Sequence, residues 1–279
     1  MDAKTELYGI IGNPVRHSLS PVIHNGAFGR MGRNAIYLAF EVKNLREALN
    51  GIRGLGIRGV SVTIPFKTEV ISFLDRLDHF AGKVKAVNTI ANVEGDLVGY
   101  NTDCFGALEA LEEKVDLKGK KVILLGAGGA ARAIAFGLKQ RGCHVVLFNR
   151  SHSRAEALAR ELGCPHHCLW SLKEMDGDIL VNATSVGMSP LDRASPVPKE
   201  VLRKGLVVMD IVYRPLRTRL IREAEEKGAV TIDGLEMLAR QGGAQLDIWT
   251  GVKHEVGQIK EDLRRVLETR GHQAMGQRQ

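Results

Sequence analysis

The sequence predicts an α/β protein with two domains, each built on a sheet whose strands alternate with helices. Strand-like runs rich in Val, Ile and Leu alternate with helical segments over most of the chain, which is typical of sheets covered on both faces. The alternation restarts near residue 103. The chain has 279 residues, 31 of them glycine, which suits two modest domains with many tight turns.

The N-terminal domain is expected over residues 1–103. Its strands are predicted at 7–12, 35–42 and 59–64, followed by a hairpin over 86–103 that turns at Glu94-Gly95. Its helices are predicted after Ser20-Pro21, after Asn44 and over 68–77. Proline suits a first helical turn and asparagine can cap a helix, so the first two starts have a local physical reason.

The second domain is expected over residues 104–237. Its strands are predicted at 120–128, 144–150, 178–185, 206–213 and 229–234, and its helices at 105–114, 129–142, 153–163 and 216–227. The remaining C-terminal helices, about 238–279, are expected to pack back on the first domain, with a cleft between the two domains.

Charge, cysteines and hydropathy narrow the class of protein. The net charge is +7, but Lys and Arg alternate with acids, so nucleic acid is the weakest choice of partner. No apolar run approaches the ~20 residues of a membrane span, and the first residues lack a signal pattern, so we expect a cytoplasmic protein. The four cysteines show no disulfide framework. Cys164–Cys168 is too short a segment to place four ligands around zinc, so no metal is predicted.

The segment Gly126–Ala131 has the GxGxxA pattern between an apolar strand and a helix. The first glycine permits a tight turn, the second lets a pyrophosphate approach the backbone, and the small third residue lets helix and strand pack closely. The helix N-terminus offers free N–H groups to phosphates. Gly126, Ala127, Gly128, Gly129 and Ala130 are therefore the predicted dinucleotide loop of a Rossmann-type, doubly wound domain.

The next strand ends in Asn149-Arg150-Ser151, with Arg154 shortly after. An NAD site places an acid at this point to bind the ribose 2′-hydroxyl. Arg150 can instead pair with a 2′-phosphate and Ser151 can donate to it, so the cofactor is predicted to be NADP(H). The alternative is that Arg150 is a solvated arginine at a strand end. Two further strand ends, near Thr184 and Ile211, could contact the nicotinamide.

The first domain contains two polar features that raise a functional question. Ser18 and Ser20 are two residues apart in a loop and could bind a carboxylate, although either could also serve only the loop or a helix cap. The buried strand before Pro65 is followed by Lys67, which is either a solvated charge or a proton donor.

The ordered motifs NPVRHSLSP, SVTIPFK, AVNT, GYNTD, GAGGAARA, NRS, NATSVGM and DGLEMLARQ resemble those of the shikimate dehydrogenases. The resemblance covers residues 9 to about 251. It implies a two-domain α/β enzyme that reversibly reduces 3-dehydroshikimate to shikimate with NADPH, in the pathway to chorismate and the aromatic amino acids.

The resemblance also implies roles for individual residues. Ser18 and Ser20 match the carboxylate-binding pair, and Lys67 and Asp103 match the catalytic acid–base pair, with the proton donor left open between them. The other implied substrate residues are Thr63, Asn88, Tyr213 and Gln241. The implied cofactor residues are 126–130, Asn149, Arg150, Ser151, Arg154, Thr184, Ile211 and Gly234.

Two other interpretations of the sequence stay open beside this resemblance. A shikimate/quinate dehydrogenase would accept a further ring hydroxyl and often use NAD, and the Asn-Arg-Ser sequence argues against it. A catalytically silent NADP-binding sensor is a second alternative, against which Lys67 and Asp103 argue. Shikimate or 3-dehydroshikimate is the expected partner, without nucleic acid or membrane, and a homodimer is an open alternative for the assembly.

Overall fold

A computed structural model describes residues 1–172 and 176–276, with side chains described up to residue 267 outside that gap. Contacts divide the chain into two compact units. Unit 1 comprises Met1–Thr102 together with the segment from Gln241 onward, and unit 2 is Asp103–Arg240. The predicted limits of independently folding domains, 1–103 and 104–237, stay a prediction.

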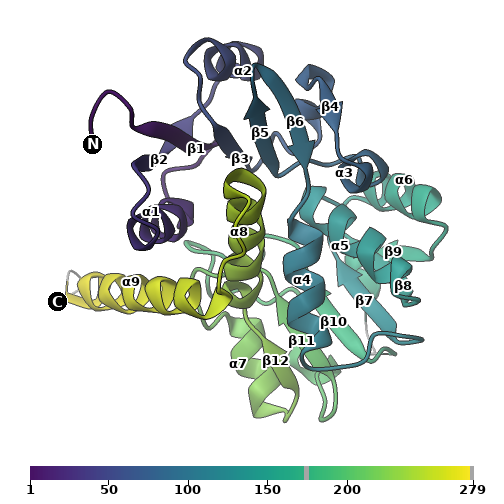
Figure 1. Ribbon diagram of the computed structural model, residues 1–279. Helices are drawn as coiled ribbons and strands as arrows, with labels where there is room; N and C mark the ends of the chain where they lie inside the picture. The colour runs from purple at the N-terminus through teal and green to yellow at the C-terminus, as the bar shows by residue number, and fades with distance from the viewer. Residues whose placement is uncertain (173–175, 277–279) are drawn as a thin grey trace. The chain divides into compact units, whose positions relative to one another are not determined.

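Unit 1 contains a mixed sheet of six described strands (Figure 1). In spatial order these are β2 (Ala35–Glu41), β1 (Glu6–Gly12), β3 (Gly59–Val62), β5 (Thr89–Val93), β6 (Asp96–Tyr100) and β4 (Arg76–Leu77). The first three are parallel, whereas β5 runs antiparallel to both β3 and β6. The predicted hairpin accounts for the antiparallel pair β5–β6, because Glu94 and Gly95 adopt positive φ and turn the chain back at once.

The helices of unit 1 bury apolar faces against this sheet and against one another. They are α1 (Ser20–Arg30), α2 (Leu45–Gly54), α3 (His79–Val84), α9 (Val256–Gly276) and the last ten residues of α8 (Gly234–Thr250). Asn44 caps α2 as predicted, since its side chain accepts a hydrogen bond from the Glu47 N–H. Leu45, Leu49 and Ile52 of α2 then enter the core beside β3. Helix α9 packs against α1 (Figure 1).

The prediction of a helix over residues 68–77 is wrong. The segment forms a 3₁₀ turn (Glu69–Phe73), then strand β4, and α3 follows. Asp75 is the reason, because its backbone N–H donates to the Leu97 carbonyl at 3.0 Å and its carboxylate accepts from the Leu97 N–H at 2.7 Å. These two bonds tie the chain to β6, where a helix could not continue.

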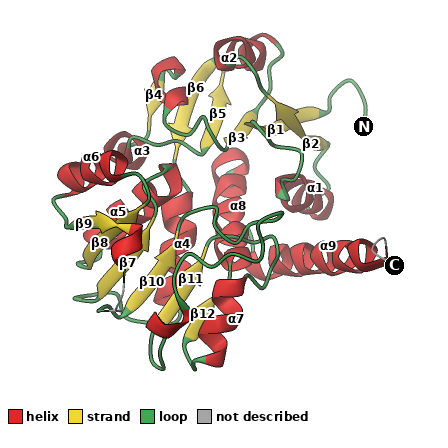
Figure 2. Cartoon of the chain, turned by 180° about the vertical axis from the view of Figure 1, so that it is seen from behind, coloured by secondary structure: helices red, strands yellow, loops and turns green. Residues whose placement is uncertain are grey.

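Unit 2 contains a parallel sheet of six described strands (Figure 2). In spatial order they are β12 (Val230–Ile232), β11 (Val207–Asp210), β10 (Ile179–Asn182), β7 (Lys121–Leu125), β8 (His144–Asn149) and β9 (His166–Cys168). Every described pair is parallel. Numbered from β7, this is the 3-2-1-4-5-6 order of doubly wound dinucleotide-binding sheets, so the predicted fold class is confirmed. The short strand β9 is absent from the prediction.

The helices of unit 2 are α4 (Asp103–Glu112), α5 (Gly129–Gln140), α6 (His152–Leu162) and α7 (Arg219–Glu226), with 3₁₀ turns at Leu169–Ser171 and Lys199–Val201. The first seven residues of α8 also belong to this unit. Leu220 and Ala224 of α7 pack on Leu180 and Val208 of the sheet. Burial of each such leucine or valine stabilises the fold by roughly 1.5–3 kcal/mol. The topology places the carboxyl ends of β7 and β10 side by side, where the strand order reverses.

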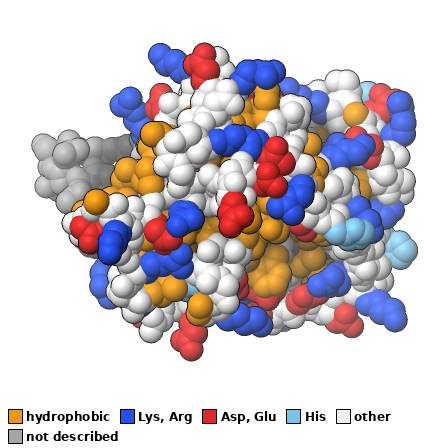
Figure 3. All heavy atoms as spheres, turned by 45° about the horizontal axis from the view of Figure 1, so that its top comes forward, with side chains coloured by type: hydrophobic (Ala, Val, Ile, Leu, Met, Phe, Trp, Pro, Cys, Tyr) orange, Lys and Arg blue, Asp and Glu red, His pale blue; other side chains and the backbone are white. Residues whose placement is uncertain are grey.

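Charge is dispersed on the face of the molecule shown in Figure 3. Lys and Arg side chains lie among Asp and Glu rather than in one basic patch. Ion pairs account for part of this mixing, as for Arg53 with Asp75 at 2.6 Å and Arg33 with Glu6 at 2.7 Å. Among the helices of the described residues, none has the length and apolar character needed to cross a membrane.

Candidate active site

In unit 1, the loop after β1 brings Ser18 and Ser20 together. The Ser18 hydroxyl donates to Ser20 Oγ at 3.1 Å, and the Ser20 backbone N–H donates back to Ser18 Oγ at 3.1 Å. Ser20 is the first residue of α1 rather than its cap, which is Leu19. Two hydroxyls held side by side at a helix N-terminus form a suitable environment for a carboxylate.

Thr63 and Lys67 lie in the turn that follows β3. The Phe66 N–H closes this turn onto the Thr63 carbonyl at 3.0 Å, and the Lys67 carbonyl accepts from Val87 N–H at 2.7 Å. Both side chains are half-buried. Gly12 is required beside them, since a Cβ there would lie 2.3 Å from Thr63 Cγ2. The two backbone hydrogen bonds fix the turn that carries Lys67.

Asn88 is almost fully buried, at 2% exposure, where β5 begins. Its Nδ2 donates to Thr102 Oγ1 at 2.9 Å and to Gln241 Oε1 at 3.3 Å, and its Oδ1 accepts from the Thr102 N–H at 2.8 Å. The end of β6 and the start of the unit 1 part of α8 are thus joined through one amide. The structure brings Asn88 and Gln241 together, a pairing that could not be read from their separation in sequence.

Asp103 and Tyr213 belong to unit 2. Asp103 is the first residue of α4, is 3% exposed and immediately follows Thr102, whose backbone is bonded to Asn88. A carboxylate in the first turn of a helix is stabilised by the helix dipole. Tyr213 is half-buried just beyond β11. The predicted pairing of Asp103 with Lys67 joins different units and stays a prediction.

The glycine loop of unit 2 lies between β7 and α5, as predicted. Gly126 has φ +117°, and a Cβ there would lie 2.9 Å from the Ala183 carbonyl oxygen beyond β10. Gly128 is the N-cap of α5, lacks a side-chain cap bond, and has open space where a Cβ would stand. Open space over free N–H groups at a helix start fits a pyrophosphate. The loop therefore fits the predicted dinucleotide.

The end of β8 presents the predicted ribose-phosphate residues. Asn149 Nδ2 donates to the Ser151 carbonyl at 2.9 Å, and Ser151 Oγ lies 3.2 Å from Ser153 Oγ at the start of α6. Arg150 and Arg154 are exposed and form no ion pair with the described residues. Two guanidinium groups that form no ion pair with the described residues, beside a helix N-terminus, suit a doubly charged anion such as a 2′-phosphate.

A buried carboxylate organises the ends of β10 and β11. Asp210 accepts from Asn182 Nδ2 at 2.9 Å, from the Val212 N–H at 3.0 Å and from Thr218 Oγ1 at 2.7 Å. Burial nevertheless raises the pKa of Asp210 to about 6, because desolvation outweighs these donors. The network holds the two loops at the sheet's reversal point.

Thr184, Ile211 and Gly234 are positioned by those loops. Thr184 Oγ1 donates to Asn182 Oδ1 at 2.7 Å, and the Ile211 N–H donates to the Asn182 carbonyl at 3.1 Å. A Cβ on Gly234 would lie 2.6 Å from the Ile211 carbonyl oxygen, so this residue must be small. The three predicted nicotinamide residues thus lie at the same edge of the unit 2 sheet.

Three buried polar residues beneath the unit 1 site are absent from the prediction. They are Tyr37, Ser61 and Gln245, which are joined by hydrogen bonds. Ser61 is the one polar side chain in the apolar run 59–62, and Gln245 lies four residues after Gln241 on the same helix face. These two patterns could have indicated a polar contact, but they could not identify its partners.

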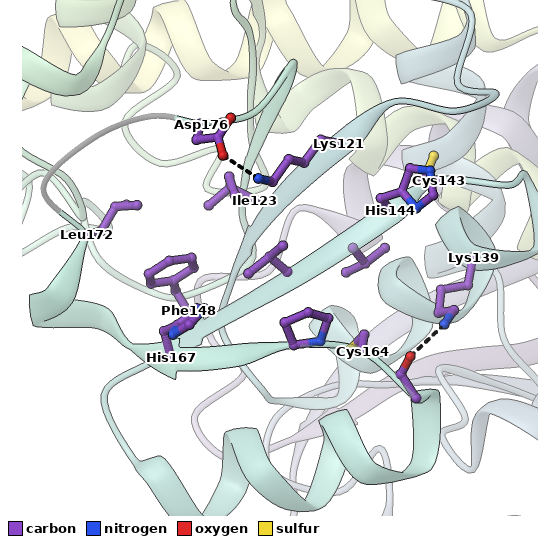
Figure 4. A pocket seen from close by; sticks show the side chains of 14 residues that line it. Lys121, Ile123, Lys139, Cys143, His144, Phe148, Cys164, His167, Leu172 and Asp176 are labelled. Carbon is purple, nitrogen blue, oxygen red and sulfur yellow. Dashed lines mark hydrogen bonds and ion pairs between the residues drawn. The ribbon is translucent and has the colours of Figure 1, made fainter.

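A separate hollow of about 490 Å³ lies in unit 2, along β7, β8 and β9 (Figure 4). Lys121 and His144, the first residues of β7 and β8, lie on its wall, whereas the glycine loop follows the opposite end of β7. The Lys121 ammonium is bound to Asp176, and Lys139 donates to the Leu162 carbonyl at 2.7 Å. None of the described lining residues is a predicted site residue.

Family models match both halves of the chain. Residues 10–90 match the shikimate dehydrogenase substrate binding domain, and residues 109–238 match the shikimate / quinate 5-dehydrogenase model. A curated relative, shikimate dehydrogenase (NADP(+)) of Pyrococcus furiosus, is 48% identical over 274 residues, which is 95% of this chain and 96% of the relative.

Solved structures agree with this match. A shikimate dehydrogenase crystallised in complex with NADP+ has a TM-score of 0.91 and 42% identity, covering 96% of this chain and 97% of its own. The shikimate 5-dehydrogenase of Thermus thermophilus, in complex with NADP(H) and shikimate, has a TM-score of 0.87 and 40% identity, covering 93% and 99%.

Proposed function

The chain belongs to the shikimate dehydrogenase family, and we propose that it catalyses the reversible, NADPH-dependent reduction of 3-dehydroshikimate to shikimate. This is a step of the pathway that leads to chorismate and the aromatic amino acids. The match of both halves of the chain to family members carries the proposal, together with the glycine loop and the polar site of unit 1.

We assign NADP(H) to the loops at the carboxyl edge of the unit 2 sheet. The N–H groups at the start of α5, beside Gly128, would hold the pyrophosphate, and Arg150 with Ser151 would hold the 2′-phosphate. When bound, the nicotinamide supplies the hydride. The small residue Gly234 leaves room for it at the edge that Thr184 and Ile211 form.

We assign the substrate to the polar groups of unit 1. Ser18 and Ser20 can donate to its carboxylate, and the amides of Asn88 and Gln241, with Thr63, can bind its ring hydroxyls. The family resemblance adds Tyr213, a residue of unit 2. Reduction of the ketone leaves a developing alkoxide that must be stabilised and protonated. The ammonium of Lys67 can do both, and Asp103 can accept from that ammonium and from a substrate hydroxyl.

A crossed assay tests substrate and cofactor together. Shikimate and quinate are each offered with NADP+ and with NAD+, and reduced nicotinamide is followed by absorbance. We expect turnover with shikimate and NADP+ to exceed every other combination. Faster turnover with quinate and NAD+ would show that the chain is a shikimate/quinate dehydrogenase. Binding of NADPH without any turnover would support a sensor.

Replacement of Arg150 by Ala tests the 2′-phosphate assignment. We expect the KM for NADP+ to rise at least about tenfold and the KM for NAD+ to stay within about twofold, because the lost pair is specific to the phosphate. Arg160→Ala is the matched control, since Arg160 is an exposed arginine of α6 that pairs with Glu156 at 3.1 Å. Equal effects of Arg150→Ala on both cofactors would show that Arg150 is only a surface charge.

A further inference from the structure

A continuous chain of buried hydrogen bonds runs beneath the proposed substrate site within unit 1 and ends at Asn88. Tyr37 donates its hydroxyl proton to Ser61 Oγ at 2.6 Å. Ser61 Oγ in turn donates to Gln245 Oε1 at 2.9 Å, and Gln245 Nε2 donates to the Asn88 carbonyl at 3.1 Å. Each member is at most 5% exposed.

The direction of every bond in this chain follows from one contact. The Asn88 backbone carbonyl can only accept, so the Gln245 group that faces it must be the NH₂. Gln245 Oε1 therefore faces Ser61, which must donate to it, and the Ser61 oxygen is left to accept from Tyr37. His24 lies 3.2 Å from the same Oε1 and must carry its proton on Nε2.

The same glutamine also orients the side chain of Asn88. Gln245 Nε2 donates to Thr89 Oγ1 at 2.9 Å, which leaves the Thr89 hydroxyl proton for Asn88 Oδ1 at 2.8 Å. Asn88 Oδ1 thus accepts from Thr89 as well as from the Thr102 N–H, and its Nδ2 donates to Gln241 Oε1. Gln245 therefore holds Asn88 at two points, the backbone carbonyl and, through Thr89, the side-chain oxygen.

We propose that Gln245 is a positioning residue for the substrate site: it holds Asn88 at the hydroxyl end, directly through the backbone carbonyl and indirectly through Thr89. This inference rests on the proposed function. Gln245 contributes through these residues and is not assigned a contact with substrate.

The fold places this network on residues from four elements. Tyr37 lies on β2, Ser61 on β3, Thr89 on β5 and Gln245 on α8. A buried polar network costs desolvation free energy that an apolar core would avoid. What this network provides in return is a defined geometry of its hydrogen-bonding groups. Because each bond has one permitted direction, loss of the glutamine releases several hydroxyl orientations together.

Two variants test the proposal by steady-state kinetics. Gln245→Met keeps the volume and removes the amide, and Thr89→Val removes the hydroxyl that donates to Asn88 Oδ1. We expect the KM for shikimate to rise about tenfold in the first and about fivefold in the second, the effect of one to two lost hydrogen bonds. The KM for NADP+ should stay within about twofold.

Trp249→Phe is the matched control for general loosening of α8. Trp249 lies one turn beyond Gln245, and its Nε1 donates to the Ile90 carbonyl at 3.0 Å outside the chain of bonds. We expect this variant to lose thermal stability with an unchanged KM for shikimate.

The outcomes separate the two claims. If the wild-type chain does not oxidise shikimate, the proposed function falls and the positioning role falls with it. If it does, and the KM for shikimate in Thr89→Val and Gln245→Met equals that of wild type or of Trp249→Phe, the positioning role alone is overturned. Should Gln245→Met not fold, Thr89→Val decides, since valine has nearly the shape of threonine and leaves the packing intact.

Discussion

His24 is a neutral imidazole enclosed by aromatic rings in unit 1. Its ring stacks on Tyr37 at 4.3 Å and meets Trp249 at 5.0 Å, and its Nδ1 has no hydrogen-bond partner among the described residues. Burial lowers the pKa of His24 from 6.5 to about 3, because a charged imidazole would lose its hydration there. Between pH 6.5 and about 3, protonation of His24 therefore favours the unfolded chain.

The consequence is a defined loss of stability in acid. The pKa of His24 is lower in the folded chain than in the unfolded chain. Its contribution to the free energy of unfolding is therefore complete above pH 6.5 and is lost as the pH falls toward about 3. Between pH 7 and 4.5 we expect His24 to account for a loss of about 2–3 kcal/mol in the free energy of unfolding.

Urea titrations of the wild type and His24→Gln at both pH values measure this contribution. The advantage of the wild type over the variant should shrink by that amount at pH 4.5. A difference between the two proteins that does not change with pH would show that His24 is accessible to protons in the folded state.

Residues whose role depends on near neighbours could be predicted from the sequence. The cap at Asn44 and the turn at Gly126 depend on a few residues of local chain, and the structure confirms both conformations. Ser61 and Gln245 could not be paired in this way, because 184 positions separate them and their contact depends on the complete fold of unit 1.

At the scale of the element, the turn between β7 and α5 makes different demands on its two glycines. Gly126 needs its positive φ and lies against Ala183, whereas Gly128 has an extended backbone of φ −87° and ψ −175° that any residue adopts. Gly126→Ala should lower the free energy of unfolding by about 1–3 kcal/mol, from strain and contact. Gly128→Ala should change it by less than about 0.5 kcal/mol.

The two variants should separate folding from cofactor binding. A methyl group at Gly128 would occupy the space proposed for the pyrophosphate. We therefore expect the Kd of Gly128→Ala for NADP+ to rise at least about tenfold while the variant keeps its stability. Denaturant unfolding without nucleotide and calorimetric titration with NADP+ give the two quantities. Unchanged NADP+ affinity in Gly128→Ala would place the pyrophosphate elsewhere.

Elements with a strong local pattern are predicted well, and those that depend on a distant partner are not. The hairpin at Glu94-Gly95 and the strands of unit 2 with continuous apolar runs are confirmed. The segment 68–77 has helix-forming residues, yet the bonds of Asp75 to β6 override that preference. Strand β9, with its sequence His-His-Cys, has no apolar periodicity and exists because it pairs with β8.

At the scale of the whole molecule, the chain order alone does not define the compact units. Unit 1 is completed by the segment from Gln241 onward, which supplies Gln241, Gln245 and Trp249 to strands formed more than 100 residues earlier. The cleft between the domains and the pairing of Lys67 with Asp103 stay predictions.

The most direct test of the proposed function is the rate of NADP+ reduction by shikimate in the wild type and in Lys67→Ala. We predict that kcat falls at least about 10²-fold in the variant, the contribution typical of a positioned proton donor or acceptor, while the Kd for NADP+ stays within about twofold. A variant that keeps kcat within about threefold of the wild type would contradict the account and leave Lys67 as a charge at the end of a strand.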